Sequence, residues 1–276
     1  MSYEIPKYSE GFFSKEELAL SSSFLEKGYA IVPADDQAAL DAVRDAFVGF
    51  AADFLKVSKP KDPADFLNNI HKQVSITQLN EFRLSVYNQF NGLPWARKNY
   101  FSLARRHLEV LIGNELAMQK RINLSIQLPN DSSSLLPVHS DVWSGDSPFE
   151  MVLWVPLVDC FKTKGMFFLP PKKNEEYVAK LAEIGKKSAE DLYETIAPDL
   201  LWLDVPYGHV LIFSHIMMHG NRINTEPETR WSMNCRFKGL FAPFWDKRLG
   251  EFFEPITIRP ASRLGMEYSL PGGFNE

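Results

Sequence analysis

The second part of the chain consists of short apolar segments separated by turn-forming residues, and this pattern restricts the fold more than any other feature. Ile122, Leu124, Ile126 and Leu128 alternate with polar residues, a period of two that is typical of a strand with one polar face. Several short strands separated by Gly, Pro, Asn and Asp turns predict two sheets that pack as a barrel. Further strand-like apolar segments follow at 151–158, 165–169, 202–205, 210–214 and 230–237.

The residues before position 120 show mainly helical spacing. Ser14 and Glu17 have the spacing of a capping box, which marks the beginning of a helix. Apolar residues at helical spacing then predict longer helices. We expect helices at 14–26, 36–56, 78–90 and 94–118, one short strand at 28–33, and a polar helical insertion at 174–196.

These patterns predict a mainly β fold with flanking helices around a double-stranded β-helix (jelly-roll, cupin-like) core. We expect one domain over residues 1–276, a length that is ample for a large buried core. Its helical part covers about 1–119, its jelly-roll core about 120–240, and a C-terminal extension 241–276.

Composition excludes several classes of function. Hydrophobic residues make up 45% and charged residues 24%, and the formal net charge is −5, so no overall basic field attracts nucleic acid. Two cysteines are too few for a disulfide framework and indicate a reducing compartment. Neither a signal peptide nor a membrane span is visible. We expect a cytoplasmic protein that binds a small-molecule substrate but neither nucleic acid nor membrane, and a homo-oligomer is compatible with this.

Two histidines and an aspartate form a candidate metal site. His139 and Asp141 are separated by a single residue, Ser140, near a strand end, so extended backbone directs both side chains to one face. His219 follows the apolar segment 210–214. Two imidazoles and one carboxylate leave metal positions open, which suits non-haem Fe(II). His215 shares strand parity with His219, so geometry alone does not separate them. We favour His219 because Arg230 returns to the same neighbourhood on the next strand.

Arg230 is the candidate anchor for a keto-acid. Alternation places Arg230, Ser232, Asn234 and Arg236 on one strand face. If this face lies inside the barrel, the guanidinium and a hydroxyl can bind the far carboxylate of a dicarboxylic keto-acid whose other end chelates the metal. The alternative is an exposed cationic face, or a pair between Arg230 and Asp204.

These residues resemble the Fe(II)/2-oxoglutarate-dependent dioxygenases, most closely the phytanoyl-CoA dioxygenase-like branch. The resemblance covers roughly residues 120–240. It implies that His139, Asp141 and His219 are iron ligands and catalytic residues, and that Arg230 binds 2-oxoglutarate with help from Ser232. Related halogenases have a small residue at the carboxylate position, so the presence of Asp141 favours hydroxylation or another oxidation.

The resemblance also suggests secondary contacts. Gln127, on the strand that leads to the metal-site loop, is implied as a further cosubstrate contact. The loop 143–150 is similar to that of a bacterial subgroup found among carbohydrate-biosynthesis genes, which implies a sugar or nucleotide-sugar substrate. The family often has Gly-Asp where this chain has Gly208-His209, a departure that touches no ligand.

The expected function is oxidation of a C–H bond in a small polar metabolite, with Fe(II) as cofactor and 2-oxoglutarate and O2 as cosubstrates. Hydroxylation, desaturation and ring closure are all open to such a site. Candidate substrate contacts are Trp143, Trp154, His215 and Asn221, for which ordinary packing explains the residue type equally well. The alternatives are a cupin-like metal-dependent isomerase, epimerase or hydrolase that uses no keto-acid, and a metal-free scaffold. A buried guanidinium that can bind a carboxylate, as expected for Arg230, argues against the first alternative, because water activation by a metal does not need one.

Overall fold

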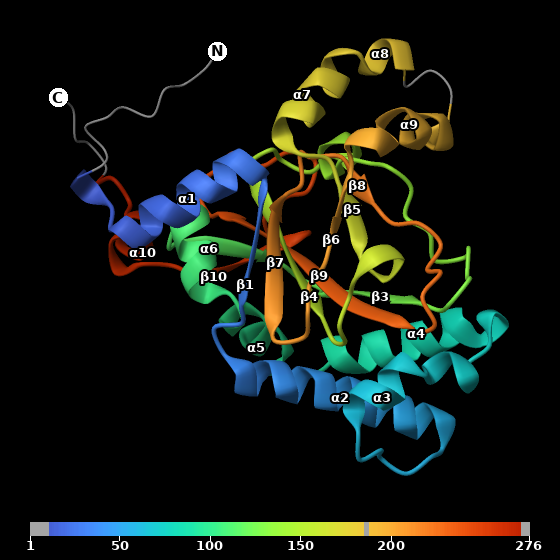
Figure 1. Ribbon diagram of the computed structural model, residues 1–276. Coiled ribbons are helices and arrows are strands. Elements are labelled where there is room, and N and C mark those ends of the chain that lie inside the picture. Colours follow the sequence, from blue (N-terminus) through green and yellow to red (C-terminus); the bar gives the residue numbers. More distant parts are fainter. Residues whose placement is uncertain (1–10, 185–187, 272–276) are drawn as a thin grey trace.

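The strands form two antiparallel sheets (Figure 1), and apolar side chains of the two sheets pack against each other. The structure is a computed structural model that describes residues 11–184 and 188–271. The N-terminal segment, on which the expectation of no signal peptide rests, lies outside these residues. The strands are β1 (Tyr29–Pro33), β2 (Leu116–Gln119), β3 (Asn123–Gln127), β4 (Glu150–Pro156), β5 (Met166–Phe168), β6 (Leu201–Leu203), β7 (His209–Ser214), β8 (His219–Gly220), β9 (Arg230–Gly239) and β10 (Phe253–Thr257).

The larger sheet has the order β1-β7-β4-β9-β2-β10, with β3 also paired to β9, and the smaller sheet has the order β6-β5-β8. Apolar side chains from both sheets meet between them, among them Trp154 and Phe213 from the larger sheet and Phe168 from the smaller. This arrangement confirms the expected mainly β fold with a two-sheet, jelly-roll core and flanking helices.

Helices cover the outer faces of both sheets (Figure 1). Helices α2 and α4 bury Phe47 and Phe82 against Trp231 of β9, while α9 packs Leu192 and Ile196 against the smaller sheet. Among the described residues, no helix is both long and apolar enough to cross a membrane. The helices are α1 (Lys15–Lys27), α2 (Gln37–Leu55), α3 (Pro63–Asn68), α4 (Ile76–Asn91), α5 (Ala96–Ser102), α6 (Arg105–Leu111), α7 (Pro171–Ala179), α8 (Leu181–Ile184), α9 (Ala189–Ile196) and α10 (Pro260–Glu267).

Local sequence signals explain several of these boundaries. The Ser14 hydroxyl accepts a hydrogen bond from the Glu17 backbone, and the Glu17 carboxylate accepts one from the Ser14 backbone, so the predicted capping box is formed. Helix α1 then ends at Gly28, whose φ of 77° suits glycine. The expected insertion at 174–196 is helical in its described part, as α7, α8 and α9.

The helix expected at 94–118 is wrong beyond Leu111. Helices α5 and α6 are separate and short, and the chain then passes through Gly113, whose φ of 127° is open mainly to glycine. Residues 116–119 form β2, which is buried between β9 and β10. Strands β1, β2 and β10 therefore extend the sheet beyond the expected core at 120–240.

Trp231 joins the helical layer to the sheet, so its truncation tests this packing. It is completely buried, and its indole N–H donates to the Leu67 carbonyl at 2.9 Å. We expect Trp231→Ala to lower the free energy of unfolding by about 3–5 kcal/mol, measured by urea denaturation. The matched control is Trp245→Ala, at a side chain that is 63% exposed, and it should change that free energy by about 0.5 kcal/mol or less. Equal losses in the two variants would contradict the assigned packing.

Candidate active site

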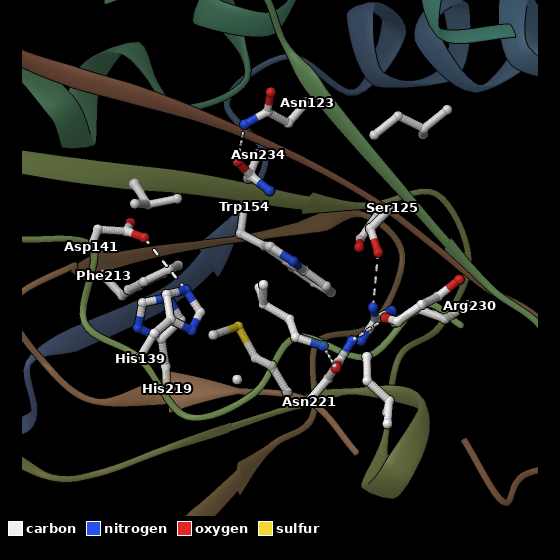
Figure 2. Close-up of a pocket in the computed structure, with 18 of the residues that line it drawn as sticks. Asn123, Ser125, His139, Asp141, Trp154, Phe213, His219, Asn221, Arg230 and Asn234 are labelled. Atoms are coloured by element: carbon white, nitrogen blue, oxygen red, sulfur yellow. Dashed lines mark hydrogen bonds and ion pairs between the residues drawn. The ribbon is translucent and has the colours of Figure 1, made fainter. Parts of the chain in front are cut away.

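A short backbone bridge brings the two metal-site histidines together. The His139 N–H donates to the His219 carbonyl at 3.1 Å, and the His219 N–H donates to the His139 carbonyl at 2.9 Å. Their ring centroids lie 4.3 Å apart (Figure 2). His219 does not lie at the end of β7. A turn follows β7, and His219 begins β8 in the smaller sheet, opposite Phe168 of β5.

Both imidazoles are held so that one nitrogen is free. Nδ1 of His139 lies 2.8 Å from the Pro137 carbonyl, and Nδ1 of His219 lies 2.9 Å from the Met217 carbonyl. With the proton on Nδ1, each ring donates to its carbonyl and keeps the Nε2 lone pair for a metal. Burial, together with the neighbouring His139, lowers the pKa of His219 to about 4, so His219 is neutral at neutral pH, as a ligand must be.

Asp141 completes a group that fits a divalent metal. Candidate ligand atoms of His139, Asp141 and His219 all lie within 4.8 Å of one another, and His139 Nε2 is 3.4 Å from Asp141 Oδ1. Burial alone would raise the pKa of Asp141, but the imidazoles of His139 and His215 and the charge of Arg236 outweigh it and hold that pKa well below its usual range. One carboxylate and two neutral imidazoles are the donor set that non-haem iron uses.

His215 lies beside this group and not in the cavity. It is completely buried. Its Nε2 is 2.7 Å from the Ser147 carbonyl, and its Nδ1 is 3.7 Å from Asp141 Oδ2. Its backbone carbonyl also accepts a hydrogen bond from the Asp141 N–H at 3.1 Å. The structure therefore places His215 against Asp141 and outside the cavity.

A cavity of about 480 Å³ joins the metal group to Arg230. The face of β9 expected to point inward does so, because all four of its predicted residues line the cavity. In Figure 2 the side chain of Trp154 lies between the histidines and Arg230. The lining includes Asn123, Ser125, His139, Asp141, Val152, Trp154, Met166, Phe213, His219, Asn221, Arg230, Ser232, Asn234 and Arg236.

Arg230 is a buried cation without an acidic partner among the described residues. Its Nη1 donates to the Gly165 carbonyl at 3.1 Å and its Nη2 to the Ser125 hydroxyl at 2.8 Å, while its Nε has no partner. Burial lowers the pKa of Arg230 to about 10. The hydroxyl of Ser232 is also buried and unpartnered. A charged guanidinium and a free hydroxyl in one cavity fit a carboxylate ligand.

The remaining predicted residues are placed as follows. Trp154 and Asn221 line the cavity. Gln127 is buried outside it, where its Nε2 donates to the Arg222 carbonyl and its Oε1 has no partner. Trp143 is 44% exposed and is not among the lining residues. The assigned roles of these side chains stay predictions.

Several side chains at the site were not predicted as site residues, among them Arg236, Ser125 and Asn123. Arg236 forms an ion pair with Asp141, with Nη2 3.0 Å from Oδ1. Ser125 lies opposite Ser232 in the β3–β9 pairing and supports Arg230. Asn123 donates to Asn234 at 3.0 Å across the same pair of strands. Alternation along the strand predicted that Arg236 lies on the inward face. Ser125 and Asn123 reach the site through the register of β3 against β9, which the local sequence does not predict.

Gly220 allows the close approach that joins the histidines. A Cβ at this position would lie 2.7 Å from the Leu136 carbonyl oxygen and 2.7 Å from the Phe167 ring. We expect Gly220→Ala to lower the free energy of unfolding by about 1–3 kcal/mol, measured by urea denaturation. Gly49→Ala, at a position in α2 where a Cβ meets nothing within 4 Å, should instead raise it by about 0.5–1 kcal/mol. A neutral Gly220→Ala variant would contradict the tight packing beside His219.

Comparison with solved structures identifies the fold. The nickel complex of the non-haem monooxygenase ThoJ is 14% identical, with 88% of this chain and 85% of that chain covered and a TM-score of 0.54. EctD from S. alaskensis, with 2-oxoglutarate and 5-hydroxyectoine, is 16% identical, with coverage of 84% and 78% and a TM-score of 0.54. HygX from Streptomyces hygroscopicus, with nickel and 2-oxoglutarate, is 13% identical, with coverage of 86% and 90% and a TM-score of 0.50.

No protein-family model matches the sequence, and no curated protein matches it. At these low identities the likeness to solved structures concerns the fold. The chain has the jelly-roll fold of these solved structures.

Proposed function

We propose that this protein is a non-haem Fe(II)- and 2-oxoglutarate-dependent oxygenase that oxidises a C–H bond of a small polar metabolite. His139, Asp141 and His219 would hold the iron, and Arg230 with Ser232 would hold the far carboxylate of 2-oxoglutarate. When bound, the iron supplies oxygen activation coupled to oxidative decarboxylation of the keto-acid. Solved structures of the same fold hold 2-oxoglutarate together with nickel or with 5-hydroxyectoine, which supports the assignment.

The single observation that carries this proposal is that Arg230 is buried without an acidic partner among the described residues. A buried charge without a counter-charge is costly for a folded protein. The cost is reduced when a carboxylate occupies the cavity and pairs with the guanidinium. Because the metal group lines the same cavity, one dicarboxylic keto-acid can reach both ends of it.

Other lining residues would orient the ligands and limit water. Trp154, Phe213, Val152 and Met166 give the inner wall an apolar surface, which offers water few polar contacts beside the metal group. Ser125 fixes Arg230 through its hydroxyl, so the guanidinium is oriented before a ligand arrives. Such preorganisation lowers the free-energy cost of binding.

The polar part of the lining supports a hydroxyl-rich substrate. Hydroxyl and amide groups both donate and accept hydrogen bonds, which matches the surface of a sugar or nucleotide-sugar. We propose this substrate class on the chemistry of five residues that line the cavity: Asn123, Ser133, Ser134, Ser144 and Asn234.

The cupin-like isomerase or hydrolase is the weaker candidate. Both activities need a general base or a metal-bound water, and neither uses a second anchor for a carboxylate. Arg230 and the unpartnered Ser232 would then have no ligand, although both are buried. No observation in the cavity favours that reading over the oxygenase.

Loss of the Arg230 charge should weaken cosubstrate binding. In anaerobic ultraviolet-visible titrations of the Fe(II)-loaded protein, we expect 2-oxoglutarate to produce a weak visible charge-transfer band. Charge-assisted hydrogen bonds contribute about 1.5–3 kcal/mol each, so Arg230→Met should raise the Kd for 2-oxoglutarate roughly 10–100-fold. His219→Ala should abolish the band.

The control for charge loss is Arg222→Met, because this guanidinium pairs with Glu190 outside the cavity. It should leave the Kd for 2-oxoglutarate unchanged. If folded, Fe(II)-loaded wild type gave no band, the keto-acid function would be wrong. If Arg222→Met weakened binding as much as Arg230→Met, Arg230 would not be the anchor.

Substrate-dependent succinate release tests the substrate class. We expect free sugars or nucleotide-sugars to stimulate succinate formation from 2-oxoglutarate, measured by mass spectrometry in the presence of Fe(II) and O2. The polar lining gives the reason for this preference over acyl groups. Stimulation by an acyl substrate with none by any sugar compound would contradict the assigned class while leaving the oxygenase activity intact.

A further inference from the structure

One oxygen atom of Asp141 faces two competing groups. Asp141 Oδ1 lies 3.4 Å from His139 Nε2, the nitrogen that is free for a metal, and 3.0 Å from Nη2 of Arg236. The side chains of Asp141 and Arg236 are only 8% and 14% exposed, so solvent screens their attraction weakly. A metal bound at this oxygen must therefore share the negative charge of Asp141 with the guanidinium of Arg236.

Arg236 has a second carboxylate partner. Its Nε lies 3.2 Å from Oδ1 of Asp146, whose side chain is completely buried. Asp146 in turn forms an ion pair with the ammonium group of Lys247. The order Asp141, Arg236, Asp146, Lys247 is thus a chain of alternating charges that begins at the metal group.

Lys247 belongs to the loop 240–250, which follows β9 and lies in the C-terminal extension. This loop packs on the segment that comes after Asp141. The Ser147 hydroxyl donates to the Pro243 carbonyl at 2.7 Å, and a Cβ on Gly145 would lie 2.7 Å from Asp246 Oδ2. The position of Lys247 relative to Asp146 is therefore set by packing between two loops.

We propose that Arg236 is a positioning residue for Asp141, and that Asp146 and Lys247 set how strongly it engages that ligand, so that the loop 240–250 controls the metal affinity of the site. This inference rests on the proposed metal site. Asp141 and Asp146 compete for a single guanidinium. Asp146 draws the cation away from Asp141, and Lys247 weakens that pull by neutralising Asp146.

A second metal ion beside Asp146 is disfavoured by the charges already there. Ligand atoms of Asp146, Glu150 and His215 also lie within 4.8 Å of one another. Two cations, Arg236 and Lys247, already neutralise the Asp146 carboxylate, and a divalent metal would have to displace both. One metal per chain is therefore expected.

Competition for the guanidinium predicts opposite effects of two substitutions. Asp146→Asn removes the competing anion, so Arg236 pairs more fully with Asp141, and metal affinity should fall about tenfold. Lys247→Met frees Asp146 to draw Arg236 away, and affinity should rise by a factor of roughly three to five. Because Lys247 acts through Asp146, the double variant should have the affinity of Asp146→Asn alone.

The test is calorimetric titration of metal-free, full-length protein with Co(II) alone. The matched control is Arg248→Met, which removes the same charge from the next residue, an exposed position in the same loop. It should leave the Co(II) affinity unchanged. Thermal denaturation of each metal-free variant checks that the fold is retained, and Lys247→Met tests the proposal even if Asp146→Asn fails to fold.

The outcomes separate this proposal from the proposed function. If wild type bound no Co(II), the metal site itself would be wrong. If wild type bound one Co(II) but Lys247→Met lowered or did not change the affinity, the ion-pair chain would be wrong while the metal site stood. If the Co(II) affinity rose in both Lys247→Met and Arg248→Met, the change in net charge alone would explain the effect. Binding of two Co(II) ions would favour a second metal site. Each of these results overturns the proposal.

Discussion

Strand β9 has to satisfy two environments at once, because its side chains alternate between the helical layer and the cavity. Trp231, Met233, Cys235 and Phe237 are buried in the apolar core, while Arg230, Ser232, Asn234 and Arg236 line the cavity. A slip of one residue against its neighbours would exchange the two sets and bury four polar side chains among aromatic rings. Packing against the helices therefore fixes the position of the candidate cosubstrate anchor. The same strand carries Arg236 to the opposite end of the cavity, where it meets Asp141.

The cavity concentrates polar groups that the protein itself leaves unsatisfied. Arg230 has a free Nε and Ser232 a free hydroxyl, and both side chains are buried and line the cavity. Such groups cost stability, and these two lie on the same inward face of β9. A ligand with a carboxylate at one end and metal-binding oxygens at the other would recover much of that cost. The Asp146–Lys247 pair, by contrast, lies outside the cavity and is satisfied within the protein, which fits a structural or positioning role.

Sequence patterns predicted those parts of the fold in which one strand or helix determines its own periodicity. The alternation at Asn123–Gln127 and Arg230–Gly239 gave the strands and the inward face, and Ser14 with Glu17 gave the first helix. The prediction failed at residues 116–119, because this short apolar segment is buried and carries no alternation that separates strand from helix. His215 and His219 have the same local parity. Only the turn after β7, which moves the chain into the other sheet, separates His219, the candidate ligand, from His215, which lies against Asp141. The partners of Arg236 depend on the register between distant segments and leave no local signal.

Two-point attachment of the keto-acid is the central claim, and calorimetry with matched ligands tests it most directly. Oxygen-free, Fe(II)-loaded protein would be titrated with 2-oxoglutarate, with 2-oxobutyrate, which lacks the far carboxylate, and with glutarate, which lacks the keto group. Anchoring by both Arg230 and the metal predicts that 2-oxoglutarate binds at least roughly tenfold more tightly than either analogue. Equal affinity for 2-oxobutyrate would show that Arg230 holds no carboxylate, and equal affinity for glutarate would show that the keto group does not reach the metal.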